Sequence, residues 1–453
     1  MLSLLLSVPV RRGALGLILV AVVLFPSGTS GHHRRSCPAG RCSADGAISW
    51  SRPLAGSWLA ENGIQGTVYA QGQAYAAVGS GVAAVGYGLT LDAFDAATGF
   101  PRWAATLGGV PAGSSIISVR VWPGVVTAGV QVVANSGSNS IAAVGGNSGS
   151  GSDGGVLRSG EPTIAGRKEF VLNAVTGKQL RVYPAAWFGG AVSADLKSSV
   201  IVGARSVASY ANRTGKVRWR IPTGAGGQAW QVSGNDLYVT VSATGPAGTA
   251  PVTAVREINL RNGAQRLIQP AGRSFDGRLS GVLDDELLFS SADGLRMYSG
   301  PTGGLTGFRA GAVPEMLDSV QEELYVDVGG ALIGIDPVTG KDERGTSYPG
   351  PPGTYGVRDG VALGLDPGAK GAAWGYNIAR KHVIWTSRSL PWPHFFVDLS
   401  GLGGSSDPSS DAVLLVTCAK VGQRVRSAEA SVAEAGAAPA DDCLRPMLVA
   451  IER

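Results

Sequence analysis

Short apolar runs that begin and end on polar residues recur along most of the chain, as in Glu169–Asn173 and Glu323–Asp327. Runs of this length, bounded by Gly, Asp, Asn and Thr, are typical of β-strands rather than of amphipathic helices. The one long uninterrupted apolar stretch, Gly13–Phe25, lies near the N-terminus. The pattern therefore predicts an all-β protein preceded by an N-terminal helix.

One motif recurs where these runs end. It consists of Asp or Asn, two variable residues, Thr-Gly, and often a Trp four residues after the Gly; the clearest copy contains Asp95, Gly99 and Trp103. The other copies contain Gly177, Gly215 with Trp219, Gly263, Gly303, Asp336 with Gly340, and, without the glycine, Trp385. An Asp or Asn that accepts turn N–H groups, followed by a Gly with positive φ, predicts a hairpin.

The motif glycines follow one another at intervals of about 40 residues, which is the repeat length of β-propeller blades. Two turn-rich stretches, Asn135–Gly155 between the copies at Gly99 and Gly177 and residues 421–442 in the last blade, are interpreted as surface insertions.

The two ends of the chain each carry half of the motif. Residues 447–453 resemble its first strand, and Asp45–Trp50 resemble the second half with its Trp. A strand from one terminus that completes a sheet of the other closes a propeller without an unpaired edge. Seven internal copies and one split copy predict an eight-bladed propeller over residues 45–453. Seven blades is the alternative, because the copies at Gly263 and Gly303 are weak.

The motif resembles the repeat of the pyrroloquinoline-quinone (PQQ) propellers, the quinoprotein alcohol dehydrogenase-like family. The resemblance covers nearly all of residues 45–453. It implies that Trp50, Trp103, Trp219 and Trp385 pack against neighbouring blades as structural residues.

The resemblance also describes the site of the catalytic members, which bind PQQ and Ca²⁺ next to two adjacent cysteines. This sequence has no adjacent cysteine pair and no identifiable calcium set. We therefore expect no catalytic, cofactor-binding or metal-binding residues, and no cofactor.

Residues 1–44 are interpreted as an export signal or membrane anchor followed by a linker. Arg11 and Arg12 precede the apolar stretch, and small residues follow it, which is the layout of an export signal. Neither Cys37 nor Cys42 follows a lipid-attachment sequence, so no lipid anchor is expected. The propeller is predicted to be extracytoplasmic, anchored by the N-terminal helix or secreted if this segment is cleaved.

The four cysteines agree with an exported protein. An even number in such a chain favours disulfides, which we expect to be Cys37–Cys42 and Cys418–Cys443. The second bridge would join two consecutive strands of the closing blade across the inserted loop. A four-cysteine metal site would need closer paired spacing.

Charge narrows the range of partners. The 38 basic and 33 acidic residues give a net charge of +5, and the basic residues form no long run. Nucleic-acid binding is not expected. The sequence favours a non-enzymatic propeller that binds a cell-envelope protein or ligand as a scaffold. Two alternatives remain: a sensor propeller for a small ligand or carbohydrate, and a PQQ-dependent oxidoreductase.

Overall fold

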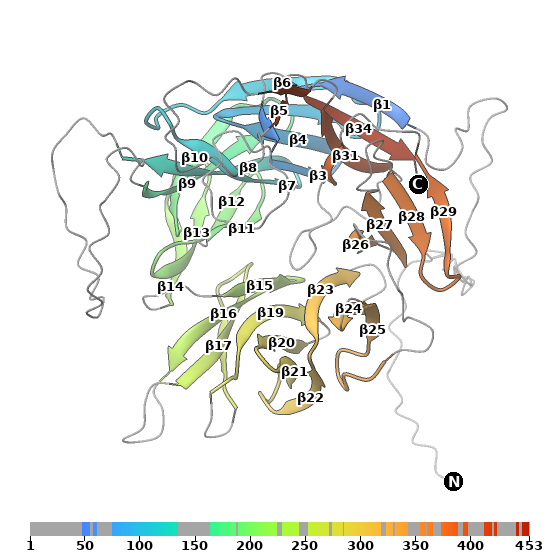
Figure 1. The fold of residues 1–453 in the computed structure, drawn as a ribbon. Helices are drawn as coiled ribbons and strands as arrows, with labels where there is room; N and C mark the ends of the chain where they lie inside the picture. The colour runs from blue at the N-terminus through green and yellow to red at the C-terminus, as the bar shows by residue number, and fades with distance from the viewer. Residues whose placement is uncertain are drawn as a thin grey trace, which may run out of the picture. The chain divides into compact units, whose positions relative to one another are not determined.

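A computed structural model describes nineteen segments of the chain, all within the unit Ser43–Arg453. They are residues 48–54, 58–60, 75–134, 164–186, 189–223, 229–243, 252–270, 274–283, 285–318, 323–328, 331–342, 354–358, 360–365, 373–387, 393–396, 412–418, 421–423, 441–443 and 446–452. Every regular element in these segments is a β-strand (Figure 1). The all-β prediction is confirmed for this part of the chain.

Six sheets are blades of a β-propeller, each made of four consecutive antiparallel strands. The first two blades contain β3 (Tyr75–Gly79), β4 (Val82–Tyr87), β5 (Thr90–Asp95) and β6 (Pro101–Thr106), then β7 (Ser115–Trp122), β8 (Val125–Val133), β9 (Ile164–Asn173) and β10 (Gln179–Ala185). The next two contain β11 (Gly190–Ala194), β12 (Ser198–Val202), β13 (Ser206–Ala211) and β14 (Val217–Pro222), then β15 (Trp230–Ser233), β16 (Asp236–Ala243), β17 (Val252–Asn259) and β18 (Gln265–Ile268). The last two contain β19 (Arg278–Leu283), β20 (Glu286–Ser291), β21 (Gly294–Ser299) and β22 (Leu305–Ala310), then β26 (Thr354–Arg358), β27 (Val361–Leu365), β28 (Ala373–Asn377) and β29 (His382–Thr386).

Burial within a blade follows from the place of each strand. First strands of successive blades contact one another, as β3 contacts β7 and β15 contacts β19. All six residues of the second strand β4 are buried, because neighbouring sheets cover both of its faces. The fourth strand β6 forms the other edge of its sheet and exposes most of its side chains.

The two ends of the chain meet in a further four-stranded sheet, called here the closing sheet. Its order is β1 (Ile48–Pro53), β34 (Pro446–Glu452), β31 (Ala412–Cys418) and β30 (Pro393–Phe396). Trp50 is paired with Ala450, and Ser51 with Val449, in the antiparallel ladder between β1 and β34. The N-terminal strand therefore lies beside the C-terminal strand, as the split motif predicts.

The remaining described strands form two three-stranded sheets. One contains β23 (Val313–Asp318), β24 (Glu323–Val328) and β25 (Ala331–Ile335), and an isolated bridge joins Ile335 to Asp342, where the described segment ends. The other contains β2 (Trp58–Ala60), β33 (Asp441–Cys443) and β32 (Val421–Gln423) and is not anticipated by the motif.

The predicted number of blades is wrong. Eight blades, or seven, followed from treating each motif copy as a complete blade, whereas six sheets consist of four consecutive strands. The copy at Asp336 belongs to the three-stranded sheet β23–β25, and the split copy belongs to the closing sheet with strands from both termini. A motif copy specifies a turn between two strands, and it does not specify how many strands the sheet contains.

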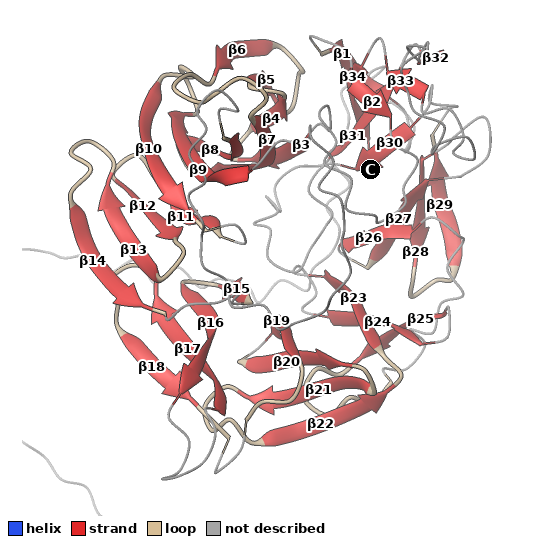
Figure 2. Cartoon of the chain, turned by 60° about the vertical axis from the view of Figure 1, so that its left-hand side comes forward, coloured by secondary structure: helices blue, strands red, loops and turns tan. Residues whose placement is uncertain are grey.

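The apolar core lies between neighbouring sheets, which stand side by side in Figure 2. One cluster joins the closing sheet to the first blade and contains Trp50, Phe94 and Leu448. Another joins the first two blades and contains Leu91 and Phe170. Similar clusters occupy the next five sheet-to-sheet contacts, up to the one between β23–β25 and β26–β29.

The predicted N-terminal helix cannot be assigned to any described residue. Residues 1–44 lie outside the described segments, as does the insertion Asn135–Gly155, and the described residues contain no helix. Among the described residues, no helix is long and apolar enough to cross a membrane.

Candidate functional site

The repeat motif forms the tight turn between the third and fourth strands of a blade. In the first blade, Asp95 Oδ1 accepts hydrogen bonds from the N–H groups of Ala97 and Thr98, at 3.2 and 3.0 Å. Gly99 has a φ of 69°, and its N–H donates to the Asp95 carbonyl at 2.8 Å. The side-chain acceptor and the left-handed glycine together reverse the chain.

The other motif copies repeat this geometry. Asn173 and Asp336 each accept two turn N–H groups, at 2.9 and 2.8 Å respectively. The motif glycines all have positive φ: 68° at Gly177, 71° at Gly215, 74° at Gly263, 70° at Gly303 and 68° at Gly340.

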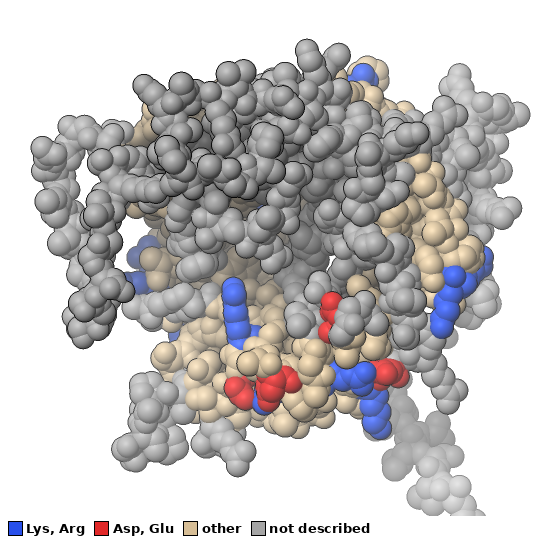
Figure 3. Space-filling model, in the orientation of Figure 1, with Lys and Arg blue, Asp and Glu red and all other residues tan. Residues whose placement is uncertain are grey.

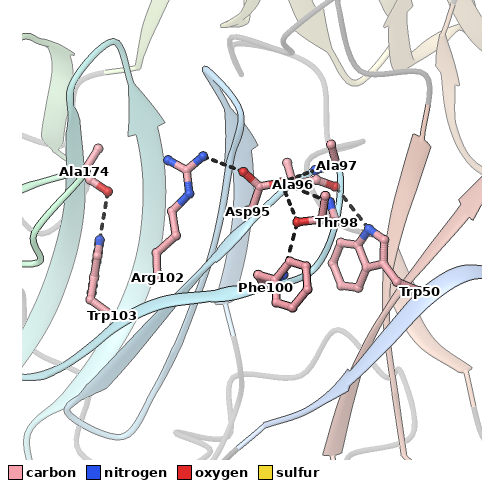
Figure 4. A network of polar contacts seen from close by, with 9 residues as sticks. All are labelled: Trp50, Asp95, Ala96, Ala97, Thr98, Phe100, Arg102, Trp103 and Ala174. Atoms are coloured by element: carbon pink, nitrogen blue, oxygen red, sulfur yellow. Dashed lines mark hydrogen bonds and ion pairs between the residues drawn. The ribbon is translucent and has the colours of Figure 1, made fainter.

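The motif tryptophans connect neighbouring sheets (Figure 4). Trp103 Nε1 donates to the carbonyl of Ala174 in the next blade, at 2.8 Å. Its ring lies on the motif glycine of that blade, where a Cβ on Gly177 would come within 2.7 Å of the indole. We call this contact, a fourth-strand side chain held on the motif turn of the next sheet, a latch.

Trp50 forms the latch between the closing sheet and the first blade. Its Nε1 donates to the Ala96 carbonyl at 3.2 Å, and a Cβ on Gly99 would lie 2.5 Å from its ring. Arg52 on the same strand donates to the Gly99 carbonyl at 2.7 Å. The N-terminal strand therefore holds the closing sheet against the first blade through two side chains.

Arg181 takes the place of the motif Trp in the second blade and makes a polar latch. Its Nη2 donates to the Arg213 carbonyl at 3.0 Å and its Nε to the Asn212 carbonyl at 3.4 Å, both in the next motif turn. A Cβ on Gly215 would contact its guanidinium at 3.4 Å. A long basic side chain can therefore occupy a latch position because the acceptors are main-chain carbonyls.

The other two motif tryptophans lack the hydrogen bond to a main-chain carbonyl among the described residues. Trp219 lies on Gly263, where a Cβ would come within 2.8 Å of its ring, but its buried Nε1 has no hydrogen-bond partner among the described residues. Trp385 is buried against Gly375 of its own blade, and its Nε1 likewise has no partner in the described segments.

Two further motif glycines, like Gly215, meet groups other than tryptophan. Gly340 faces the methyl end of Met297, and Gly303 faces the main chain at Gln269 and Pro270.

An ion pair on the outer strand stabilises the first motif turn. Arg102 Nη2 lies 2.7 Å from Asp95 Oδ2. This hydrogen bond is the largest influence on the pKa of Asp95 and lowers it below its usual value; burial opposes it, and the hydrogen bonds from Thr98 lower the pKa further. The carboxylate is therefore ionised while it accepts the turn N–H groups.

A second group of polar side chains lies on strands of the second and fourth blades. It contains Ser118 and Arg120 on β7, Arg167 and Glu169 on β9, and Trp230 on β15, and we call it the inner cluster. Arg167 Nη2 donates to Ser118 Oγ at 2.6 Å and lies 3.4 Å from Glu169 Oε2. Arg120 donates to the Ala191 carbonyl of β11 at 2.8 Å, and its Cζ lies 5.1 Å from the centre of the Trp230 ring.

Two glycines make room for this cluster. A Cβ on Gly129 of β8 would lie 2.3 Å from Arg167 Nη2 and 2.4 Å from Ser118 Oγ. A Cβ on Gly190 of β11 would lie 2.9 Å from Arg167 Nη2 and 3.3 Å from Glu169 Oε2. Because the ladder aligns Ser118, Gly129 and Glu169 across three strands, these groups share one face of the sheet.

Burial dominates the electrostatics of Glu169. Desolvation raises the pKa of this carboxyl, and the charges of Arg167 and Arg120 with the N–H of Ala191 oppose the rise. Both arginine charges therefore favour the ionised form of this buried carboxyl.

Sequence reasoning did not identify the inner cluster. The run Glu169–Asn173 was interpreted only as a strand. Two signals were present: a glycine, Gly129, inside the apolar strand Val125–Val133, and charged Arg167 and Glu169 two residues apart in a strand. An interior strand glycine often marks a close approach by another group.

The predicted disulfides lie on cysteines whose side chains are outside the described part of the structure, and they stay predictions. The main chain does revise the strand assignment at the second bridge. Cys418 pairs with Pro446 at the end of β31, whereas Cys443 belongs to β33 and pairs with Val421 and Trp58. The run from Cys443 to Ala450 is therefore divided between β33 and β34.

The described segments hold no group of three or more His, Cys, Asp or Glu side chains able to bind a metal ion together. On the face drawn in Figure 3, described basic and acidic side chains lie close to one another over the lower sheets.

Comparison with known proteins gives structural similarities only. No protein-family description matches the sequence, and no curated protein matches it. Similar solved structures include BamB from Moraxella catarrhalis (14% identity, 84% of this chain and 85% of that chain, TM-score 0.34). A europium-containing methanol dehydrogenase is similar at 12% identity over 82% and 84% of the two chains, with a TM-score of 0.46. The dihydro-heme d1 dehydrogenase NirN is similar at 13% identity over 70% and 66%, with a TM-score of 0.42. The propeller assignment rests on the sheets themselves.

Proposed function

We propose that this chain is an extracytoplasmic binding module without intrinsic catalysis, which presents its motif turns to a cell-envelope protein. Its attachment to the membrane through residues 1–44 is part of the same proposal. The observation that carries it is a set of exposed apolar side chains at the motif turns. Val175 is 69% exposed, Phe100 64% and Val338 43%.

These apolar residues occur where the fold holds the main chain firmly. Each lies in or next to a turn that an Asp or Asn side chain closes. A further main-chain bond ties the motif turn to the first hairpin of its blade, from Ala96 to Gly81 and from Ala174 to Gly124. Because these blades have the same strand order, their motif turns lie at the same end of the sheets. Rigid, exposed apolar groups favour protein binding because little conformational entropy is lost.

Site-specific photocrosslinking in the producing cell tests this proposal. A photoreactive residue at Val175 or Val338 is expected to give the same discrete protein adduct. Leu267, which is 50% exposed on the outer strand β18, is the matched control and is expected to give none. Equal adducts from Leu267, or no adduct from either turn, would contradict the proposal. Cell fractionation of the same samples tests the extracytoplasmic location.

The oxidoreductase alternative has a separate test. Purified protein is mixed with PQQ and Ca²⁺, and dye reduction is followed with a panel of alcohols. The proposal expects no reduction above the rate of PQQ and Ca²⁺ alone, whereas protein-dependent turnover would replace it with an enzymatic function.

A further inference from the structure

Positive charge is concentrated in the third blade. Residues 189–223, which contain β11–β14, have six basic side chains, all of them exposed, and one acidic side chain. That acid, Asp195, is engaged in its own turn, where its Oδ1 accepts from the N–H groups of Lys197 and Ser198 at 2.7 and 2.6 Å. The whole chain, by contrast, has 38 basic and 33 acidic residues. The basic side chains are Lys197, Arg205, Arg213, Lys216, Arg218 and Arg220.

Five of these side chains follow the outer strand β14 from one end to the other. Arg213 and Lys216 lie in the motif turn before the strand, and Arg218 and Arg220 lie on it. At the far end, the Arg205 carbonyl accepts from the N–H of the residue that follows β14, at 3.0 Å. We call these five residues the basic stripe.

The arginine at one position of the stripe differs from its counterparts in other blades. Arginine occurs three residues after the motif glycine in three blades, as Arg102, Arg218 and Arg266. Arg102 Nη2 lies 2.7 Å from Asp95 Oδ2, and Arg266 forms an ion pair with Glu257. The ion pairs among the described residues do not include Arg218. Its charge is therefore not neutralised within this part of the structure.

The sequence of the turn explains this difference. Ala211 precedes Gly215 by four residues, which is the spacing of Asp95 and Gly99 in the first motif. A methyl group thus stands where the first blade has the carboxylate that pairs with its outer arginine. The third blade has kept the arginine at Arg218 without the acid.

Arg220 is also without an acid among the described residues. The hydrogen bond that it makes there is a long one, from its Nη2 to Tyr210 Oη at 3.5 Å. Only Trp219 separates Arg220 from Arg218, so the two arginines share one face of the strand. Two exposed guanidinium groups at this spacing favour carboxylates, which a guanidinium binds through parallel hydrogen bonds.

The strand that carries these arginines is the outer edge of its sheet (Figure 2). Within the described segments β14 pairs with β13 on one side only. An edge strand leaves alternate main-chain N–H and C=O groups unpaired, and an extended peptide can bind to them as a further strand. Pairing with β14 of a second copy would bring like charges together, which is unfavourable. A strand with carboxylates would be complementary.

We infer that the basic stripe binds an extended acidic segment of the partner protein, which pairs with the free edge of β14. Carboxylates two residues apart in that segment pair with Arg218 and Arg220, and the basic residues at the two ends of β14 attract its flanks. A polypeptide fits the stripe better than a membrane surface does, because the charges follow a single strand whose free main-chain groups need a strand to pair with. The inference rests on the proposed function and names the chemistry of the partner.

The test is binding of a synthetic peptide to the purified full chain, followed by fluorescence anisotropy. The probe is a fluorescein-labelled peptide of alternating Glu and Thr, and the control peptide has Gln in place of every Glu. The Glu peptide is expected to bind at least about tenfold more tightly at low ionic strength, and added sodium chloride is expected to reduce this difference. Equal affinities of the two peptides would overturn the inference.

Matched arginine variants separate the stripe from the net charge of the chain. Arg218→Gln and Arg220→Gln are each expected to weaken binding of the Glu peptide about threefold, and the double variant about tenfold. Arg102→Gln and Arg266→Gln remove the same charge from outer arginines that already have an acidic partner, so they are expected to leave the affinity unchanged. Equal losses in all four single variants, or no loss in the double variant, would overturn the inference.

A further variant keeps both arginines. Ala211→Asp restores the carboxylate that the first blade has at this position, so it is expected to pair with Arg218 and weaken peptide binding as much as Arg218→Gln does. Ala211→Asn has a side chain of the same shape without the charge, and it is expected to bind as the parent chain does. Unchanged binding in Ala211→Asp, or equal weakening in both variants, would contradict the role of Arg218.

Two comparisons identify the source of any failure. Sedimentation with phosphatidylglycerol vesicles tests a membrane as the occupant: binding to vesicles that is lost in the double arginine variant, without binding of the Glu peptide, would overturn the inference in favour of a lipid surface. Photocrosslinking at Val175 and Val338 tests the proposed function separately. Crosslinks without peptide binding would overturn this inference alone, whereas peptide binding without crosslinks would contradict the proposed function alone.

Discussion

The indole N–H of Trp103 donates to the main-chain carbonyl of Ala174, 71 residues further along the chain, at 2.8 Å. The same ring covers Gly177, the turn glycine of that motif copy. One side chain thus joins the last strand of one blade to the motif turn of the next. The glycine has two roles in this contact, since it supplies the positive φ of its own turn and leaves room for the tryptophan of the preceding blade.

Substitution of the latch glycine separates these two roles. Gly177→Ala adds a Cβ 2.7 Å from the Trp103 ring, whereas Gly88→Ala, at a φ of 52°, meets nothing within 4 Å. Both substitutions lose about 1–2 kcal/mol to a left-handed alanine. Gly177→Ala is expected to cost about 1–3 kcal/mol more because the contact is overpacked. Urea denaturation measures both free energies of unfolding, and equal values would show that the latch is not tightly packed.

The hydrogen bond of the latch can be tested by comparing two tryptophans. Trp103→Phe removes a bonded N–H and leaves the Ala174 carbonyl without its partner, so it is expected to lower the free energy of unfolding by about 1 kcal/mol beyond the loss of ring area. Trp219→Phe removes a buried N–H that has no described partner. Trp219→Phe is therefore expected to lower the free energy of unfolding by about 1–2 kcal/mol less than Trp103→Phe does. A larger cost at Trp219 would mean that its N–H is bonded in solution.

The sequence predicted the local features of the fold well, and the reason lies in the turn chemistry. Asp95 and Gly99 specify a hairpin through hydrogen bonds and φ values within five residues. The pairing of β1 with β34 was also predictable, because each end carried half of one motif. The number of complete blades was not, since a turn motif leaves the length of its sheet undetermined.

The inner cluster was beyond sequence reasoning for a different reason. Its members come from β7, β9 and β15, and only the packing of separate blades brings Arg120 to Trp230. Arg181 shows the same limit on a smaller scale. An arginine in place of a motif tryptophan suggests a lost contact, yet it bonds to the same main-chain region of the next blade.

The acid stability of the first motif turn depends on Asp95. Its pKa is lowered in the folded chain, so the stabilisation is present above the unfolded-state pKa and is lost as the pH falls through the folded-state value. Asp95→Asn keeps the turn acceptor but removes the charge that pairs with Arg102. It is expected to lower the free energy of unfolding by up to about 1 kcal/mol at pH 7, because the pair is partly exposed.

Free energies of unfolding measured over a range of pH test the role of the Asp95 charge more directly than the value at pH 7. The difference between Asp95→Asn and the parent chain is expected to shrink as the pH falls from about 4, the unfolded-state pKa, through the lower folded-state pKa, below which the aspartate of the parent is neutral too. A difference that stays constant with pH would show that the charge of Asp95 does not contribute to stability.

The predicted Cys418–Cys443 bridge has a direct chemical test. Thiol titration of the denatured, unreduced protein is expected to find no free thiol if both predicted bridges form. Reduction is then expected to lower the free energy of unfolding, by about 3–4 kcal/mol for a loop of this length in the chain-entropy model. Cys443→Ser should give a similar loss, and four titratable thiols in protein isolated without reductant would rule out both bridges.

The contact between the two chain ends predicts where the propeller opens first. Trp50→Ala removes the bond to the Ala96 carbonyl and the packing against Phe94 and Leu448. We expect a loss of about 3–5 kcal/mol, as for other buried tryptophans. Hydrogen exchange should accelerate first in β1 and β34, because Trp50 holds their sheet to the first blade. Trp122→Ala is the control, since Trp122 bonds to Thr127 within its own blade at 3.3 Å. Acceleration of β34 in both variants would show that its stability does not depend on this closure.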